Sequence, residues 1–133
     1  MTSEREDGSS AIELVLLTPV LIALVFAVVQ AALLWNAQQA AVAAAQQGAR
    51  LARVAGGGTD ATDVRVATVA YLRSVGASLL DAPMVTVRRA GGWATVTVTA
   101  HAVSLLPGAT LTVRGTSRGP VETFTADVRG SAP

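Results

Sequence analysis

One apolar run occupies most of the N-terminal third of the chain. No formally charged residue occurs between Glu13 and Arg50, and residues 14–35 read LVLLTPVLIALVFAVVQAALLW. An α-helix rises about 1.5 Å per residue, so about 20 such residues cross a hydrocarbon layer about 30 Å thick. The run therefore predicts a membrane-spanning helix over about residues 11–35, with the Glu13 carboxylate at its leading edge.

The predicted helix continues past the span, because the residues that follow are rich in alanine, the best intrinsic helix former. Residues 36–55 read NAQQAAVAAAQQGARLARVA, so we expect one helix over 9–55 that begins at Ser9 or Ser10. Small residues form a stripe along its second half, at Ala37, Ala41, Ala44, Gly48 and Ala52. Such a stripe lets the helix of another subunit approach closely, or it covers a sheet of the chain itself; the pattern leaves both open.

Two residues of the apolar run have specific predicted roles. Pro19 lacks a backbone N–H and clashes with the preceding turn, which predicts a kink over residues 16–19. We expect the Thr18 hydroxyl or a neighbouring segment to satisfy the carbonyl that this kink frees. Trp35 stands where the helix leaves the bilayer, and we interpret it as an anchor at the membrane interface.

A glycine triplet, Gly56-Gly57-Gly58, ends the first predicted helix. Thr59 or Asp60 can then cap a second helix that runs to about Leu80, where the sequence Asp81-Ala82-Pro83 stops it. The apolar stripe expected on this helix consists of Val64, Thr68, Tyr71, Val75 and Leu79.

The hydrophobic period then changes from 3.6 residues to 2, which is typical of β-strands. We expect a first strand over 84–89, a hairpin turn at Ala90-Gly91-Gly92, a turn at residues 105–108, a third strand over 111–116 and a fourth over 121–126. In the second strand one face carries the apolar residues Ala94, Val96, Val98, Ala100 and Ala102.

These elements predict an α+β fold. A long N-terminal transmembrane helix continues into the soluble part and is followed by a second, amphipathic helix and a small antiparallel sheet of three to four strands. The soluble domain covers 59–126, and residues 127–133 form a disordered tail.

Composition argues against most enzymatic and nucleic-acid functions. Ten basic and nine acidic residues give a net charge of +1, which provides no basic field for nucleic acid. The chain has no cysteine and a single histidine, His101, so we expect no metal and no cofactor. Ser104 lies near His101 in sequence, but no Gly-x-Ser-x-Gly turn is present, and we expect no catalytic residues and no small-molecule substrate.

The apolar run also has to be compared with a cleavable secretory signal. A signal has a basic start, a shorter apolar core and a small-x-small cleavage site. Here the start is MTSEREDG, and the run is longer, although Ala41-Val42-Ala43 imitates such a site. A retained span is favoured, and a soluble domain released near Ala43 is the alternative. The bias of the flanking charges does not by itself fix the orientation.

The residues just before the apolar run, Gly8 to Glu13, allow two interpretations. In the first, Ser10-Ala11-Ile12-Glu13 is a capping box that satisfies free amides at the start of the helix. In the second, these residues have a role in processing and assembly, and a family resemblance supports it.

The chain resembles the TadE/TadG-like pseudopilins of the tight-adherence (Flp) type IV pilus system. The similarity rests on Gly8, on Glu13 five residues later before an apolar helix, on Pro19, and on Gly48-Ala49-Arg50. The second helix, the strands and the Leu-Pro-Gly turn are also similar. The resemblance implies that a prepilin peptidase cuts between Gly8 and Ser9, which makes residues 1–8 a leader and Glu13 the fifth residue of the mature chain.

The resemblance also implies the setting of the protein. A minor pseudopilin of this kind lies in the cytoplasmic membrane with its C-terminal domain outside the cytoplasm. Its expected partners are other pilins or pseudopilins, the prepilin peptidase and the pilus assembly platform. In a helical bundle, the new amine of Ser9 would neutralise Glu13 of a neighbour and set the stagger between subunits. The alternative is an uncleaved, single-pass anchored domain whose sheet binds a ligand.

Overall fold

The computed structural model describes residues 4–54, 60–76 and 78–121, with side chains described from Ile12 onward. The elements follow in the order α1 (Glu4–Val54), α2 (Ala61–Gly76), β1 (Leu80–Ala90), β2 (Trp93–Ala102) and β3 (Leu111–Pro120). The strands form one antiparallel sheet in the order β1-β2-β3. The predicted α+β fold is confirmed, with three strands in the described part of the chain.

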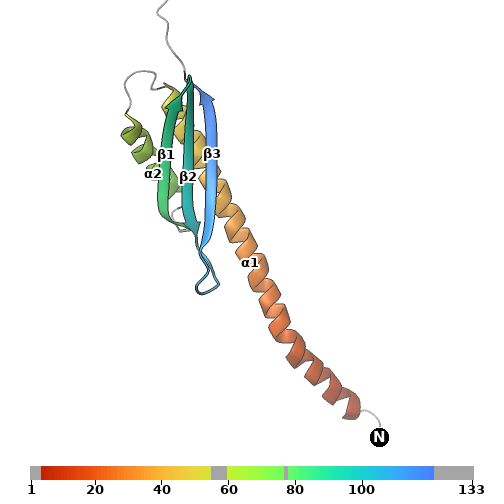
Figure 1. Ribbon diagram of the computed structural model, residues 1–133. Helices are drawn as coiled ribbons and strands as arrows, with labels where there is room; N and C mark the ends of the chain where they lie inside the picture. The colour runs from red at the N-terminus through yellow and green to blue at the C-terminus, as the bar shows by residue number, and fades with distance from the viewer. Residues whose placement is uncertain (1–3, 55–59, 77, 122–133) are drawn as a thin grey trace, which may run out of the picture.

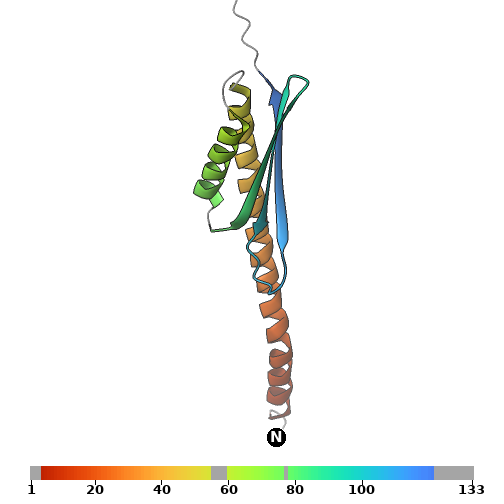
Figure 2. The same ribbon diagram turned by 60° about the vertical axis from the view of Figure 1, so that its left-hand side comes forward.

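The two helices cover one face of the sheet, and α1 extends far beyond it (Figures 1 and 2). The second half of α1 packs against β2 and β3, while α2 packs against α1 and β1. The first half of α1 projects away from the small domain without a cover from the rest of the chain. The molecule is therefore a two-layer domain on one end of a long helix.

The stripe of small residues on α1 lies against the chain's own sheet. Its alanines are buried, and Gly48 lies below Thr68 of α2 and Val96 of β2. At Gly115 of β3, the sheet comes so close that an added Cβ would overlap the backbone of Ala41. Of the two alternatives that the sequence left open, the structure therefore favours intramolecular packing over a contact between subunits for this stripe.

The helix α1 begins at Glu4, so the predicted start at Ser9 or Ser10 was wrong. The residues before Gly8 include Glu4, Glu6 and Asp7, and acidic residues near a helix N-terminus interact favourably with the helix dipole. The helix also continues through Pro19. The Thr18 hydroxyl donates to the Leu14 carbonyl at 2.6 Å, and not to the carbonyl of residue 15, which lies four residues before the proline. The kink stays a prediction.

The predicted end and apolar stripe of the second helix were partly wrong. The helix α2 ends at Gly76, and its buried residues are Val64, Thr68, Leu72 and Gly76, spaced four apart. Tyr71 and Val75, which were expected on the buried stripe, are exposed. Packing against α1 selects this row because Gly76 leaves space for Ala40, whose Cβ would lie 3.2 Å from an added methyl group.

The sequence Asp81-Ala82-Pro83 does not stop a helix but belongs to β1. Pairing begins at Leu80, which lies opposite Ala102, and the register shifts between Asp81 and Met84. Ala82 adopts a positive φ of 46° at this shift. Proline is tolerated here because β1 is an edge strand and the irregularity removes the need for a ladder donor.

The hairpin and the middle strand agree with the predicted pattern. Gly91 and Gly92 connect β1 to β2 with φ values of 57° and 75°, which favour glycine in a two-residue hairpin turn. The apolar face predicted for β2 is buried at Ala94, Val96, Val98, Ala100 and Ala102. The alternation is confirmed.

The third strand is longer than predicted, since it includes Gly119 and Pro120, which pair with Ala94 and Trp93. Gly119 fits beneath Arg53 of α1, whose Cδ would lie 2.6 Å from an added Cβ. The predicted fourth strand is described only at Val121, whose amide donates to the Gly92 carbonyl at 2.8 Å. The described residues do not include the rest of that strand, the tail over 127–133, the glycine triplet or Thr59. The Asp60 carbonyl accepts from the amides of Asp63 and Val64 in the first turn of α2.

Candidate functional site

The exposed half of α1 is the most unusual surface of the molecule. Every residue from Ile12 to Val29 is exposed, and the large apolar side chains in this stretch are 43–72% exposed. The helix contains an 18-residue window of high hydropathy of which no part is buried. A core helix of a soluble protein would be covered, so this stretch, about 27 Å long at the rise of an α-helix, has the properties of a single-pass membrane anchor.

The residues of the predicted processing site lie at the start of this surface. Gly8 and Ser9 are in the helical backbone of α1, and Glu13 is exposed one turn after Ser9. Residues four apart lie on one face of a helix, so the backbone nitrogen of Ser9 and the Glu13 side chain are on the same face. The capping box expected at Ser10 was wrong, because the backbone of α1 is already helical from Glu4 and Ser10 therefore does not stand at the start of the helix.

Trp35 lies at the boundary between the two halves of α1. Its side chain is 69% exposed, and full burial of the helix begins two residues later at Ala37. Trp35 is thus placed where the exposed apolar surface gives way to the packed domain. This position agrees with an interfacial anchor, which stays a prediction.

Two glutamines of α1 that the sequence analysis did not single out attach the helix to β3 and to the loop that precedes it. Gln30 Nε2 donates to the Val103 carbonyl at 3.4 Å, and the Leu105 amide donates to Gln30 Oε1 at 2.7 Å. Eight residues later, Gln38 Nε2 donates to the Arg114 carbonyl at 2.9 Å, and its Oε1 accepts from the Arg114 amide at 3.3 Å. Each side-chain amide pairs with the backbone as a neighbouring strand would. The signal was available at Gln30, because an amide within an apolar run is costly without a partner.

An open apolar groove of about 670 Å³ lies between the exposed half of α1 and the loop from β2 to β3. Its lining includes Phe26, Ala27 and Leu34 of the helix and Leu105 and Leu106 of the loop. No formally charged side chain contributes to it.

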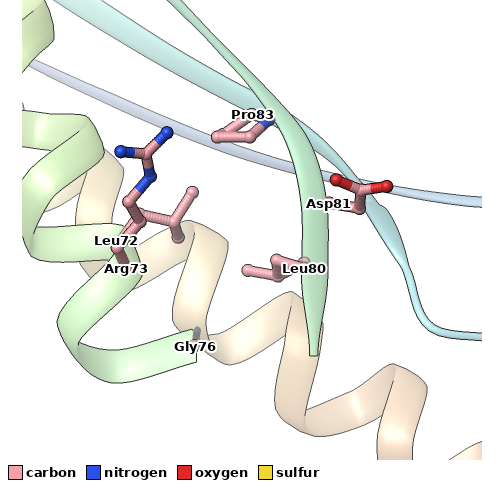
Figure 3. Close-up of a pocket in the computed structure, with 6 residues that line it drawn as sticks. All are labelled: Leu72, Arg73, Gly76, Leu80, Asp81 and Pro83. Atoms are coloured by element: carbon pink, nitrogen blue, oxygen red, sulfur yellow. The ribbon is translucent and has the colours of Figure 1, made fainter. Parts of the chain in front are cut away.

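A smaller cavity of about 260 Å³ lies where α2 meets the start of β1. Figure 3 shows the Arg73 guanidinium and the Asp81 carboxylate on opposite sides of the β1 ribbon. The Asp81 carboxylate accepts a hydrogen bond from the Ala82 amide at 2.8 Å, and Leu72 and Leu80 contribute apolar walls. The carboxylate at this cavity is therefore already engaged by the backbone of its own strand.

The residues considered for catalysis are not brought together. His101 Nδ1 lies 3.3 Å from the Thr112 hydroxyl on the adjacent strand, while the Ser104 hydroxyl donates to the Leu106 carbonyl at 3.2 Å. Within the residues that the structure describes, no group of three or more histidine, aspartate and glutamate side chains could hold a metal ion. The uncovered surface of α1 is therefore the candidate for function that the described residues support best.

Comparison with protein families gives a match to this helix. Residues 8–50 match the model of a family described as TadE-like protein. Over these residues, α1 is similar to TadE-like proteins. The match includes Gly8, Glu13, Pro19 and the Gly48-Ala49-Arg50 segment, so the resemblance expected from the sequence is confirmed over these residues. The TadE-like match does not extend to α2 or the sheet, and no match was found among curated proteins or solved structures. The family indicates involvement in the tight-adherence pilus system.

Proposed function

We propose that this chain is a minor pseudopilin, an assembly component of a tight-adherence type IV pilus or a related secretion apparatus. The main support is that the segment similar to TadE-like proteins includes an apolar stretch of membrane-spanning length that the α+β domain does not cover. In this proposal the stretch crosses the cytoplasmic membrane and the α+β domain lies outside the cytoplasm. Other pilins or pseudopilins, the prepilin peptidase and the assembly platform are the partners.

Processing between Gly8 and Ser9 is part of the proposal. The bond lies near the start of α1, where helical hydrogen bonds are fewest and the ends fray. Glycine also weakens a helix by about 1 kcal/mol relative to alanine, so local opening around Gly8 costs little. Both features favour access of a peptidase to this bond.

Glu13 sets the stagger between neighbouring subunits in this proposal. Cleavage gives Ser9 a free amine, and this positive charge compensates a carboxylate at the lipid edge that would otherwise be costly to retain. Since Ser9 and Glu13 lie one turn apart on one helix face, two parallel helices that pair amine with carboxylate are offset by about one turn. The pair then specifies register more than it adds stability.

The test is a Glu13→Ala variant expressed in the natural host. We expect it to reach the membrane at the normal level but to be depleted from purified pili and from cross-linked pilin complexes. The matched control is Gln46→Ala, which changes an exposed polar residue of α1 outside the apolar stretch. Normal incorporation of the Glu13→Ala variant would contradict the register role and would favour the uncleaved anchored binding domain, for which Glu13 is dispensable.

A further inference from the structure

We propose that the loop between β2 and β3, residues 103–110, is a second membrane-contacting element that inserts into the lipid beside α1. This inference rests on the proposed function only in requiring that the apolar half of α1 remain in a bilayer. The occupant of the apolar groove between the loop and the helix is then lipid.

The position of the loop is the first argument. Both views show it extending past the end of the sheet along α1, toward the N-terminal half of the helix (Figures 1 and 2). The groove that it forms with α1 is lined by Phe26 and Ala27, which belong to the uncovered stretch Ile12–Val29. If that stretch is in lipid, the side of the loop that faces these residues is at the same depth.

The side chains of the loop suit this environment. Val103, Leu105 and Leu106 are 42%, 42% and 58% exposed. Leu105 and Leu106 line the groove together with Phe26 of α1, so this apolar surface continues from the loop onto the helix. No formally charged residue occurs between His101 and Arg114, so no charge in or next to the loop opposes transfer into an apolar phase. A soluble domain gains nothing by presenting these leucines to water.

The hydrogen bonds of the loop backbone support the proposal independently. Hydrocarbon offers no hydrogen-bond partners, so contact with lipid favours a loop whose amides are paired within the protein, and several amides of this loop are paired in this way. The Val103 amide donates to the Leu79 carbonyl, the Leu105 amide to Gln30 and the Leu106 amide to the Ser104 hydroxyl. Pro107 has no amide hydrogen to satisfy, and the Leu106 carbonyl accepts from the Ala109 amide.

The same arrangement explains why the polar residue Gln30 occurs within an apolar helix. An uncharged amide inside an apolar helix is costly unless it is paired, and both ends of this amide are hydrogen bonded to the loop. The loop therefore shields the polar residue of the helix, and the helix in turn satisfies the loop. The pair can enter the outer part of the bilayer together, which would fix how far the domain stands from the membrane.

The absence of cysteine makes the test direct, since single cysteines can be placed in the full chain. Leu106→Cys, Val25→Cys and Thr116→Cys are each labelled with an environment-sensitive fluorophore and reconstituted into phosphatidylethanolamine–phosphatidylglycerol vesicles. Val25 lies in the uncovered stretch, and Thr116 is an exposed residue of β3. Quenching is measured with doxyl-labelled lipid and with aqueous iodide.

We expect the label at Leu106 to be quenched by doxyl lipid several-fold more than the label at Thr116, and to be protected from iodide as the label at Val25 is. Equal iodide access at Leu106 and Thr116, with Val25 in lipid, would overturn the loop insertion and leave the anchor intact. Iodide access at Val25 would instead contradict the membrane anchor and the proposed function. Protection at Leu106 without doxyl quenching, together with Cys–Cys cross-links between copies, would assign the groove to a neighbouring subunit and reject lipid.

Discussion

The two halves of α1 belong to one continuous helix but differ in the size of their apolar residues and in what covers them. From Ile12 to Val29 most side chains are large and all are uncovered, whereas from Ala37 to Ala52 the buried residues are alanine and glycine beneath the sheet. Small residues bring a sheet close enough for Gly115 to contact the backbone of Ala41. Large residues would hold that sheet away. Residue size along a single helix therefore decides which half carries the domain and which half remains for the membrane.

The largest contrast is expected between leucines in the two environments. Leu72→Ala removes a fully buried side chain of α2 that packs in the core with α1, and should lower the free energy of unfolding by about 2–5 kcal/mol. The matched variant Leu21→Ala changes an exposed residue of the apolar stretch and should leave the domain's unfolding unchanged. Urea unfolding of the full chain in detergent, followed by tryptophan fluorescence, measures both. A comparable loss for Leu21→Ala would show that the apolar stretch belongs to the folded core.

A second variant probes the close approach of the packed half. Gly115→Ala places a methyl group against the backbone of α1, which cannot rotate away, so we expect a loss of about 1–3 kcal/mol or more. In Gly76→Ala the nearest atoms are side-chain atoms of Leu80 and Ala40 at 3.0 and 3.2 Å, and the loss should be smaller. The same unfolding measurement ranks the two variants. The reverse order would mean that α1 and β3 can separate without cost.

The smallest effect concerns the glutamine that attaches α1 to the sheet edge. Gln38→Ala removes two hydrogen bonds to Arg114 of β3, and should cost about 1 kcal/mol because water can replace part of what is lost. Gln39→Ala changes the adjacent, exposed glutamine and should be neutral. Hydrogen exchange of the Arg114 amide should accelerate only in the Gln38 variant. Equal exchange in both variants would contradict the attachment.

The features that were predicted correctly depend on patterns of residues that are close together in the sequence. The period-2 pattern of β2 identified its buried face, and the two glycines at residues 91 and 92 identified the hairpin. The apolar run and the spacing from Gly8 to Glu13 predicted the resemblance of α1 to TadE-like proteins. Each of these signals depends on neighbouring residues and on nothing far away.

Several of the errors came from contacts between distant residues. Gly119 and Pro120 resemble a chain break, but Arg53 of α1 covers the glycine and the ladder continues. Asp81-Ala82-Pro83 resembles a helix stop, but pairing with β2 extends the strand through it with a shift in register. Gln30 and Gln38 could be noticed as amides on a helix, but their partners are more than seventy residues away. Tertiary pairing decided these positions.

The most direct test of the account is the N-terminal residue of the mature protein, recovered from the membrane fraction of its natural host and read by mass spectrometry. A retained anchor that is processed as a pseudopilin predicts a chain beginning at Ser9 with Ile12–Val29 still attached. A chain beginning at Met1 or Thr2 in working pili would contradict the processing and the role of the Ser9 amine. A chain beginning beyond Ala40 would contradict the membrane anchor itself.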